Sequence, residues 1–371
     1  MNILIYGTAS GNRSPDQQGQ AELLLGLNHK VFLLTHGEDD VLHANFRAMG
    51  AAAFSSSHKK GRSAVFFVRQ CSYLVWFCKH HKIDLVFCHG ISNAVIGGMA
   101  KKFCRTKFIY VRHHTDEFIV LADRKNIFLS KLANHLSDHV VAISDKVMQC
   151  LLDDRVLKKK IFRVNLCYNF EDCLSSNVKV NPAEIRKSCG VDFLLLSVSR
   201  LVKSKRILAA FEVVKNLRNK GHNCGLIVIG VGEMENELQG WIADFEMGKY
   251  IKLEGFRANV LDYLQAADVL IHPSYSEASN QVVKEMGLQK KPVVVCSDVG
   301  DFDEYLVNSV NSIIVDKEFP VTAMTDAISV LINDNKTVDI LGGNLYKTII
   351  EKFSIAAAVP DYIKMVDAVF A

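Results

Sequence analysis

Short apolar runs alternate with longer amphipathic segments along the whole chain, which predicts strands that alternate with helices. The strands predicted in the first half cover residues 3–6, 31–35, 51–54, 84–89, 108–112, 139–143 and 161–164. Those predicted in the second half cover 194–199, 226–230, 250–253, 269–271, 292–296 and 312–315. This alternation is typical of parallel sheets with helices on both faces, so the fold class is α/β.

The length of 371 residues exceeds what one hydrophobic core usually supports. Near residues 168–182 the pattern loses its periodicity, and the alternation then restarts. We therefore expect two Rossmann-like βαβ domains that face each other across a cleft. They cover 1–170 and 183–352, with a linker at 171–182 and a C-terminal helix at 353–371 that packs back towards the first domain.

The composition is that of an ordinary folded protein, with 49% hydrophobic and 23% charged residues. No apolar run reaches the roughly 18 residues that a membrane helix needs. The opening MNILIYG resembles a strand, so we expect the mature protein to begin at or near Met1 and to stay in the cytoplasm. Ten cysteines without a C-x-x-C motif are interpreted as reduced core residues.

The net charge of +4 is unevenly distributed, because residues 1–175 carry +8 and the remainder −4. A basic first half suits an anionic partner such as a phospholipid surface, although charge for solubility is an equal alternative. The segment 58–82 has basic ends and an apolar middle. It could lie on an anionic membrane, but the buried strand that follows at once favours a helix packed on the sheet. No nucleic-acid partner is expected.

Two features of the first half could carry ligand chemistry. The turn GTASG after the first strand lacks the G-x-G-x-x-G spacing, which argues against a nicotinamide or flavin cofactor. His113 and His114 follow a predicted strand, at the edge where open parallel sheets bind ligands. Adjacent side chains point apart and no third ligand is suitably spaced, so no metal site is expected there.

The stretch VLIHPSYSEASNQVVKEMG at 269–287 carries the strongest chemistry. A strand stops at Pro273, and a helix opens near Asn280 between two carboxylates, Glu277 and Glu285. Unpaired amides and the helix dipole favour an anion at such a helix start. Ionised carboxylates accept hydrogen bonds from ligand hydroxyls. A ligand with both phosphates and hydroxyls, such as a nucleotide sugar, fits both features.

Three motifs occur in order in the second half. SVSRLVKSKRI places Arg200 and Lys205 after a strand, IVIGVGEMENELQ places two glycines in a turn, and Glu277 and Glu285 form E-x7-E. Together they resemble the retaining GT-B glycosyltransferases of family 4, which carry G-R-L-x-x-x-K, G-x-G and P-S-x-x-E-G-F-G-x-x-x-x-E-A. The later PVVVCSDVGDFDEYLVNSVNSIIVD is similar to another segment of that family. The resemblance covers about residues 80 to 335.

This resemblance implies roles for individual residues. Arg200 and Lys205 would hold the donor diphosphate, while Glu285 would bind the ribose and Glu277 the sugar hydroxyls. His113 would lie beside the transferred sugar, with His114 as the fallback.

The remaining donor contacts implied by the resemblance come from loops. Backbone amides would meet the phosphate, a second loop would contact the base, and a glycine of the first domain would approach the diphosphate. These residues are Ser279, Asn280 and Gln281 for the amides, Gly255, Phe256 and Arg257 for the base, and Gly11 for the glycine.

The chain departs from the family pattern at three places, one of which is the missing second glycine of the N-terminal GG motif near Gly11. Ala278, Ser279 and Asn280 stand where the family has G-F-G, and Asp301 replaces a glycine. Serine and asparagine can still cap the helix, so donor binding remains expected. The DFD at 301–303 could be taken for a metal motif, but capping of the following helix is the favoured interpretation.

We therefore expect a retaining, metal-independent transferase that needs no cofactor and uses front-face substitution. It would move a sugar to a saccharide or lipid-linked acceptor at the inner membrane face, in bacterial lipopolysaccharide, O-antigen, capsule or exopolysaccharide biosynthesis. Two alternatives remain: a sugar-nucleotide epimerase of the same architecture, and a non-catalytic partner subunit of a transferase.

Overall fold

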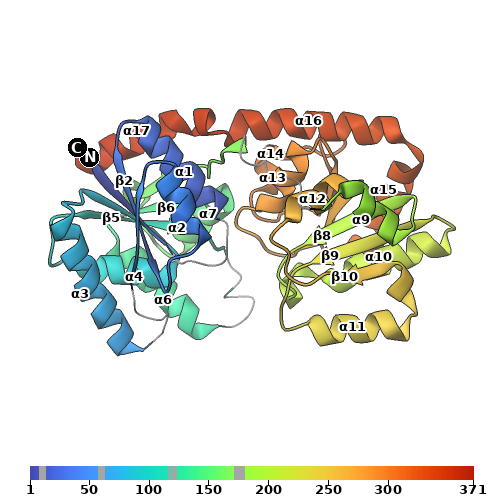
Figure 1. Cartoon of the computed structure of the whole chain (residues 1–371), viewed down its shortest axis with the longest axis horizontal. Helices are drawn as coiled ribbons and strands as arrows, with labels where there is room; N and C mark the ends of the chain where they lie inside the picture. Colours follow the sequence, from blue (N-terminus) through green and yellow to red (C-terminus); the bar gives the residue numbers. More distant parts are fainter. Residues whose placement is uncertain (8–13, 57–62, 116–117, 119–122, 171–179) are drawn as a thin grey trace. The chain divides into compact units, whose positions relative to one another are not determined.

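The computed structural model describes the chain except for residues 8–13, 57–62, 116–117, 119–122 and 171–179. It divides into two compact units, shown in Figure 1. Unit 1 comprises Met1–Asn169 with Lys352–Ala371, and unit 2 comprises Phe170–Glu351. Each unit is a parallel sheet with helices on its faces, which confirms the predicted α/β class.

The sheet of unit 1 has seven strands in the order β3-β2-β1-β4-β5-β6-β7. Its strands are β1 (Asn2–Tyr6), β2 (Lys30–His36), β3 (Ala52–Ser56), β4 (Leu85–His89), β5 (Lys107–Arg112), β6 (His139–Ala142) and β7 (Ile161–Arg163). In the interior strand β1, Ile3 pairs with Val31 on one side and with Leu85 on the other. The direction of strand addition reverses between β1 and β4, as in doubly wound folds.

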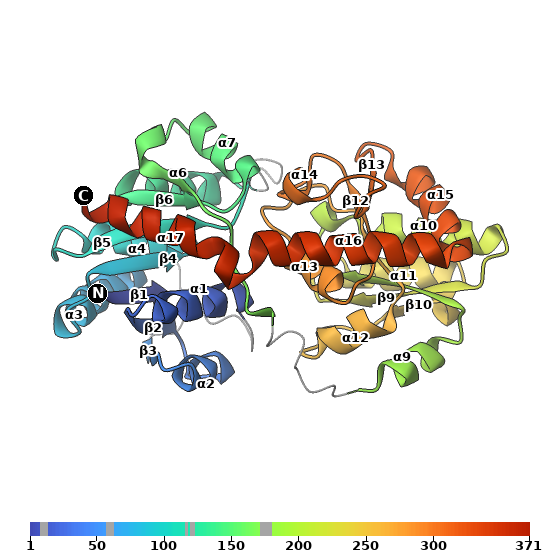
Figure 2. The same cartoon turned by 90° about the horizontal axis from the view of Figure 1, so that it is seen from above.

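Helices cover both faces of this sheet. The helix α1 contacts α2 and α17, so these three helices lie on one face of the sheet (Figure 2). The helix α4 contacts α3 and α6, and these three lie on the opposite face. The helices of unit 1 are α1 (Pro15–Gly26), α2 (Val41–Ala48), α3 (Ala64–His80), α4 (Ile91–Ala100), α6 (Arg124–Leu136), α7 (Asp145–Asp153), the short η1 (Lys158–Lys160) and α17 (Ile355–Phe370).

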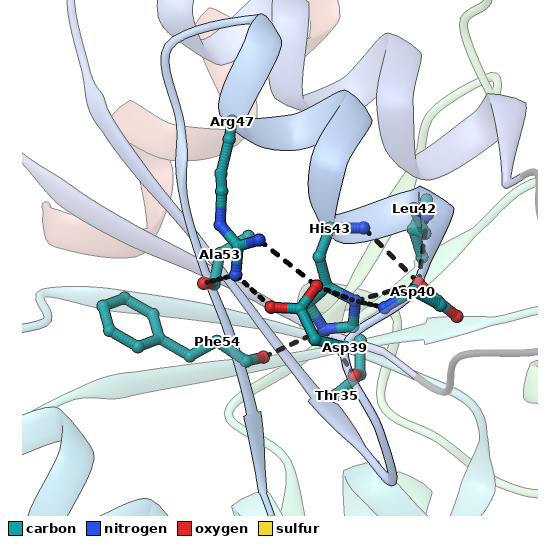
Figure 3. A network of polar contacts seen from close by, with 8 residues as sticks. All are labelled: Thr35, Asp39, Asp40, Leu42, His43, Arg47, Ala53 and Phe54. Carbon is teal, nitrogen blue, oxygen red and sulfur yellow. Dashed lines mark hydrogen bonds and ion pairs between the residues drawn. The ribbon is translucent and has the colours of Figure 1, made fainter.

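The start of α2 shows how polar side chains fix an element in unit 1 (Figure 3). Asp40 accepts hydrogen bonds from the amides of Leu42 and His43, and the His43 ring closes a capping box with Asp40. On its other side, Nε2 of His43 lies 2.9 Å from the hydroxyl of Thr35 on β2. The helix is therefore tied to the strand before it, and this buried histidine serves the fold.

The helix α3 falls within the segment that could have lain on a membrane. The ring of Phe77 on α3 packs edge-on against Phe32 of β2 and Phe54 of β3. One face of α3 is therefore covered by the sheet, as predicted. The opposite face exposes Val68 and Trp76. Among the described residues, no helix is long and apolar enough to cross a membrane.

Unit 2 has six parallel strands in the order β10-β9-β8-β11-β12-β13. They are β8 (Phe193–Val198), β9 (Cys224–Ile229), β10 (Ile251–Leu253), β11 (Val269–His272), β12 (Val293–Cys296) and β13 (Ile313–Val315). Its helices are α9 (Pro182–Cys189), η2 (Lys203–Lys205), α10 (Ile207–Asn219), α11 (Glu235–Asp244), η3 (Met247–Lys249), α12 (Val260–Ala266), α13 (Gln281–Leu288), α14 (Phe302–Tyr305), α15 (Pro320–Asn333) and α16 (Asn335–Phe353). The expected linker lies mostly outside the described residues.

Two consecutive helices end the chain. In unit 2, α16 packs on α13, where a side chain at Gly287 would meet Leu345 and Ile349 at 2.9 Å. Ser354 then caps α17 by accepting from the amide of Ala357. The second helix belongs to unit 1, where its Tyr362 is buried.

Candidate active site

Most residues predicted to bind the donor lie at the carboxyl edge of the sheet in unit 2. The neighbouring strands β8 and β11 end at Val198 and His272. From β8 the chain continues to β9 on one side, and from β11 it continues to β12 on the other. Open parallel sheets bind ligands at such a point of reversal.

Lys205 and Glu277 meet directly at this edge. Nζ of Lys205 lies 2.6 Å from Oε1 of Glu277 and 3.3 Å from the carbonyl oxygen of Ser276. Nε2 of His272 lies 2.7 Å from the same carboxylate oxygen. The side chains of Lys205 and Glu277 are only 8% and 11% exposed. A lysine from the loop after β8 and a glutamate from the loop after β11 therefore form one buried polar cluster.

The surroundings of Glu277 keep its carboxyl group ionised. Burial raises its pKa, but hydrogen bonds and charge from His272 and Lys205 outweigh that effect and hold the pKa well below its ordinary value. An ionised carboxylate only accepts hydrogen bonds, and it has room for about four. Glu277 can therefore accept from a ligand hydroxyl while Lys205 and His272 remain bound.

The ammonium group of Lys205 is also able to serve a ligand. It carries three N–H donors, and the two oxygens of Glu277 and Ser276 account for two of them. The remaining donor and the positive charge suit a phosphate oxygen. The arrangement can hold a sugar hydroxyl and a phosphate side by side.

The helix α13 begins where the sequence predicted. Asn280 caps it, because its Oδ1 accepts from the amide of Val283 at 3.0 Å. Gln281, the first helical residue, donates from Nε2 to Oε1 of Glu285 at 2.7 Å. Glu285 is 5% exposed, so the second glutamate of the pair is largely buried at this end of the helix.

A second buried ion pair lies beneath the same helix start. Nζ of Lys284 is 2.6 Å from Oδ2 of Asp301, and these side chains are 1% and 2% exposed. The hydroxyl of Ser279 donates to the same Oδ2 at 2.6 Å, and Nζ of Lys284 lies 2.9 Å from that hydroxyl. Ser279 and Asp301, which both depart from the family pattern, thus contact each other.

The capping role that the sequence suggested for the aspartates at 301–303 is wrong for Asp301. Its side chain makes no capping hydrogen bond to α14. Instead it binds Lys284 and Ser279, and its Oδ1 accepts from the amide of Asn280 at 3.4 Å. The ion pair holds this carboxylate because a buried charge needs a partner. One of the three amides expected to meet phosphate, that of Asn280, is therefore engaged already.

Arg200 stands exposed in the loop after β8, and the G-x-G turn packs directly beneath that loop. Gly230 has φ +146°, and a side chain there would meet the carbonyl oxygen of Ser199 at 1.8 Å. A side chain at Gly232 would meet the carbonyl oxygen of Leu201 at 2.3 Å. The two glycines therefore permit a close backbone approach that sets the position of Arg200.

The loop expected to contact the base follows β10 at the same sheet edge. Gly255 adopts φ +64°, and its carbonyl oxygen accepts from the amide of Gly230 at 2.8 Å. Phe256 is 64% exposed. Arg257 donates to Glu254 at 2.6 Å, and this pair is on the surface. An exposed aromatic ring next to a guanidinium can stack on a planar base.

In unit 1, the two candidate histidines after β5 have different environments. His114 is 7% exposed, and its Nε2 lies 3.0 Å from the hydroxyl of Tyr110. Burial and the neighbouring Arg112 lower its pKa to about 3, so it is a neutral core residue. The His113 side chain is 29% exposed, and its Nε2 lies 2.9 Å from Nδ1 of His89. Gly11 lies outside the described residues.

Several partners of the predicted residues were not found from the sequence. His272 ends β11 but falls just beyond the strand predicted at 269–271, and His89 was counted only as part of the strand predicted at 84–89. Lys284 stands among apolar residues on α13, which is an unusual place for a lysine. A polar residue that closes a buried parallel strand, or a lysine inside an apolar helix face, is the signal that could have pointed to them.

Two family models match the chain in succession. Residues 20–169 match the model described as Glycosyltransferase Family 4. Residues 184–348 match the one described as Glycosyl transferases group 1. The boundary between the matches falls in the region expected to link the domains. The two models together cover most of each unit.

Relatives of known function are similar to parts of the chain. The capsular polysaccharide biosynthesis glycosyltransferase CapM of Staphylococcus aureus is 25% identical over 61% of this chain and 60% of its own length. The UDP-Gal:alpha-D-GlcNAc-diphosphoundecaprenol alpha-1,3-galactosyltransferase of Escherichia coli is 23% identical over 76% of this chain and 74% of its own. The chain spans from about a fifth to three quarters of the length of the curated relatives that it matches.

A solved structure resembles the chain over nearly its whole length. Anabaena Alr3699/HepE, crystallised with UDP-glucose, superposes with a TM-score of 0.80 at 16% identity. The match covers 98% of this chain and 99% of that one. At this level of identity the likeness establishes the fold, which is the two-domain architecture predicted from the sequence.

Proposed function

The chain belongs to the glycosyltransferases of family 4 and group 1, and from this premise we propose that it transfers a sugar from a nucleotide-diphosphate sugar. The acceptor is a saccharide or a lipid-linked saccharide, and the anomeric configuration is retained. The reaction belongs to the assembly of a bacterial surface polysaccharide, such as lipopolysaccharide, O-antigen, capsule or exopolysaccharide. The names of the Staphylococcus aureus and Escherichia coli relatives support this assignment.

The observation that carries this proposal is the contact between Lys205 and Glu277 at the reversal point of the sheet in unit 2. The ammonium of Lys205 can donate a hydrogen bond to a phosphate oxygen, and the adjacent carboxylate of Glu277 can accept one from a sugar hydroxyl. In the proposed complex, Arg200 and Lys205 hold the diphosphate, Glu277 accepts from the sugar, and Glu285 accepts from the ribose. The amides of Ser279 and Gln281 complete the phosphate contacts, and the loop from Gly255 to Arg257 contacts the base.

The chemistry proposed for this site is front-face substitution. As the bond from the anomeric carbon to the diphosphate breaks, negative charge builds on the leaving oxygen, and Arg200 with Lys205 stabilises it. That oxygen then takes the proton of the attacking acceptor hydroxyl. His113 and Glu277 orient the sugar so that the acceptor approaches from the same face. No metal and no cofactor enters this scheme.

We further propose that the enzyme works at the inner face of the cytoplasmic membrane. A lipid-linked acceptor would be presented there, and the first 175 residues carry a net charge of +8, which suits an anionic surface. The exposed Val68 and Trp76 of α3 add apolar groups on the same unit.

A thermal-shift screen of the full chain tests donor binding. Sugars linked to UDP, GDP, dTDP and ADP are added singly, because a ligand that binds only the native state stabilises it by about 2.7 kcal/mol at one hundred times its Kd. We expect one nucleotide class to raise the melting temperature by several degrees. No shift with any of these donors would contradict a transferase and favour the non-catalytic partner subunit.

A product assay with the best donor separates the enzymatic alternatives. A transferase releases nucleoside diphosphate slowly alone and faster with a polyprenyl-diphosphate-linked sugar, and it forms a longer lipid-linked saccharide. A sugar-nucleotide epimerase instead yields the isomeric sugar without an acceptor. Accumulation of that isomer at a rate that the acceptor does not change would overturn the proposal.

A further inference from the structure

A line of buried polar side chains runs behind His113 in unit 1. Nε2 of His113 lies 2.9 Å from Nδ1 of His89, and Nε2 of His89 lies 2.8 Å from Oε1 of Gln20. His89 closes β4 and is 4% exposed, while Gln20 belongs to α1 and is 2% exposed. The chain of contacts thus joins the loop after β5 to a neighbouring strand and a helix on one face of the sheet.

The hydrogen positions along this line follow from the acceptor at its inner end. An amide oxygen only accepts, so Nε2 of His89 carries the proton that it donates to Gln20. Burial lowers the pKa of His89 well below its ordinary value, so the ring is neutral and its Nδ1 bears a lone pair. The contact at 2.9 Å then requires that Nε2 of His113 carries a proton and donates it to His89.

The helix α17 packs against α1, the helix that carries Gln20. Burial raises the pKa of the Tyr362 hydroxyl on α17, and a side-chain hydrogen bond with Gln20 lowers it in part. Gln20 therefore lies between the C-terminal helix and His89, whose Nε2 is 2.8 Å from its Oε1.

We propose that His89 is a positioning residue that holds the ring of His113 with its proton on Nε2 and its lone pair on Nδ1. His113 is then a fixed hydrogen-bond acceptor and recognises a hydroxyl group of the transferred sugar. The assignment of the sugar as the ligand of His113 rests on the proposed function. The orientation of the His113 ring by His89 rests only on the contacts described above, so each claim can be tested separately.

A metal ion is the rival explanation for the same group of residues. Ligand atoms of Asp16, His89 and His113 all lie within 4.8 Å of one another. Two ring nitrogens bound at about 2.0–2.1 Å to one tetrahedral ion would be about 3.3 Å apart. The observed 2.9 Å is the distance of a direct hydrogen bond. Asp16, at 3.9 Å from Nε2 of His113, adds a negative charge beside that bond.

The first test reads the protonated nitrogen directly. The full chain is labelled with 15N-histidine, and long-range 15N–1H correlation spectra are recorded without donor, with His113→Asn used to assign the His113 signals. We expect a neutral ring with its proton on Nε2. His89→Asn keeps an acceptor near Nδ1 and should preserve this state, whereas His89→Leu should give a mixture of both tautomers. A proton on Nδ1 in the wild type, or an unchanged His113 pattern in His89→Leu, would overturn the proposal.

The second test uses the transfer reaction with the donor identified in the screen. The rate constant kcat should fall about tenfold in His89→Leu and recover to within about threefold of wild type in His89→Asn. If the two variants are equally impaired while both stay folded by circular dichroism, His89 does not act through an acceptor nitrogen. If the wild type shows no transfer but its His113 spectrum is as expected, the proposed function fails and the positioning role stands.

Zinc titration of the 15N-histidine-labelled wild-type chain tests whether Asp16, His89 and His113 form a metal site instead. We expect no stoichiometric change in the His89 and His113 signals at one equivalent of Zn²⁺. Saturable zinc binding that disappears in His89→Leu, His113→Asn and Asp16→Asn alike would assign the three side chains to a metal site and overturn the hydrogen-bonded arrangement.

Discussion

At the scale of single residues, Lys205 is the group whose position says most about the site. It is buried, yet its partner Glu277 leaves it one donor for a ligand. Lys203 lies two residues earlier in the same short helix and is exposed, so it offers a matched change of charge.

Lys205→Met should weaken binding of the preferred nucleotide sugar by about ten to one hundred fold, because a hydrogen bond to a charged group contributes about 1.5–3 kcal/mol. Lys203→Met should change the Kd by less than about twofold. Isothermal titration calorimetry on both variants provides the comparison. Equal affinities would remove Lys205 from the donor site.

The lowered pKa of Glu277 should make the free energy of unfolding depend on pH in the acid range. A carboxyl group whose pKa is lower in the folded state contributes stability above its unfolded pKa of about 4.3, and this contribution is lost as the pH falls towards the folded pKa. The stability advantage of wild type over Glu277→Gln should therefore shrink by about 1 kcal/mol between pH 4.5 and pH 3.5. Urea unfolding at the two pH values measures it.

The matched control is Glu237→Gln on the exposed side of α11, which removes one carboxylate outside the cluster. Its difference from wild type should stay the same at both pH values. An advantage over Glu277→Gln that grows on acidification would mean that His272 and Lys205 do not stabilise the ionised carboxylate.

The sequence identified part of this residue pattern and missed the rest for a physical reason. Glu277 and Lys205 were found because each belongs to a short motif of fixed spacing. Lys284 and Asp301 were missed as a pair because their contact joins a helix to the loop after the next strand. His89 was missed because its partner His113 lies in the loop after a different strand, β5. Contacts between distant segments leave no local pattern in the chain.

At the scale of elements, the ion pair of Lys284 and Asp301 ties the start of α13 to the loop after β12. Lys284→Met leaves the carboxylate of Asp301 buried without its cation and should cost about 3–5 kcal/mol of unfolding free energy. The double variant Lys284→Met, Asp301→Asn removes both charges and should recover most of that loss. Urea denaturation gives the coupling energy.

Lys220 and Asp326 form an exposed pair at 2.7 Å in the same unit and serve as the control. Lys220→Met should cost less than about 1 kcal/mol. If Lys284→Met were as mild as Lys220→Met, the buried pair would not hold the helix start.

The turn between β9 and α11 makes a separate prediction. Gly230→Ala places a side chain 1.8 Å from the carbonyl oxygen of Ser199 at a φ of +146°, so the loop that bears Arg200 must move. Stability and donor affinity should fall together. Gly240→Ala, in α11 with open space around it, should instead be neutral or stabilise by up to about 1 kcal/mol. Thermal unfolding with and without donor distinguishes the two, and unchanged donor affinity in Gly230→Ala would show that this turn does not position Arg200.

The order of strands and helices could be predicted because hydrophobic periodicity is a local property. The strand expected at 194–199, for example, is β8 at Phe193–Val198. The role of Asp301 could not be predicted, because an aspartate before a short helix resembles a cap whatever it binds. Asp301 binds the buried Lys284 instead, and the sequence gives no reason to place that lysine near it.

At the scale of the whole molecule, the charge asymmetry and the two family models divide the chain in the same way. Most of the basic first part belongs to unit 1, where residues 20–169 match the Glycosyltransferase Family 4 model. Most of the acidic remainder belongs to unit 2, where residues 184–348 match the group 1 model. The two parallel sheets could be predicted from the sequence, because strands and helices alternate along each half of the chain. The donor and the acceptor could not be identified from the sequence, because many ligands share a diphosphate and hydroxyl groups.

The proposed sugar transfer depends most directly on where the donor binds. The measurement that tests it is a crystal structure of the full chain with the nucleotide sugar that gives the largest thermal shift. We predict diphosphate oxygens within about 2.7–3.2 Å of donors on Arg200 and Lys205, with a sugar hydroxyl on Glu277. A diphosphate bound away from the ends of β8 and β11, with Lys205 in contact only with Glu277 and Ser276, would contradict it.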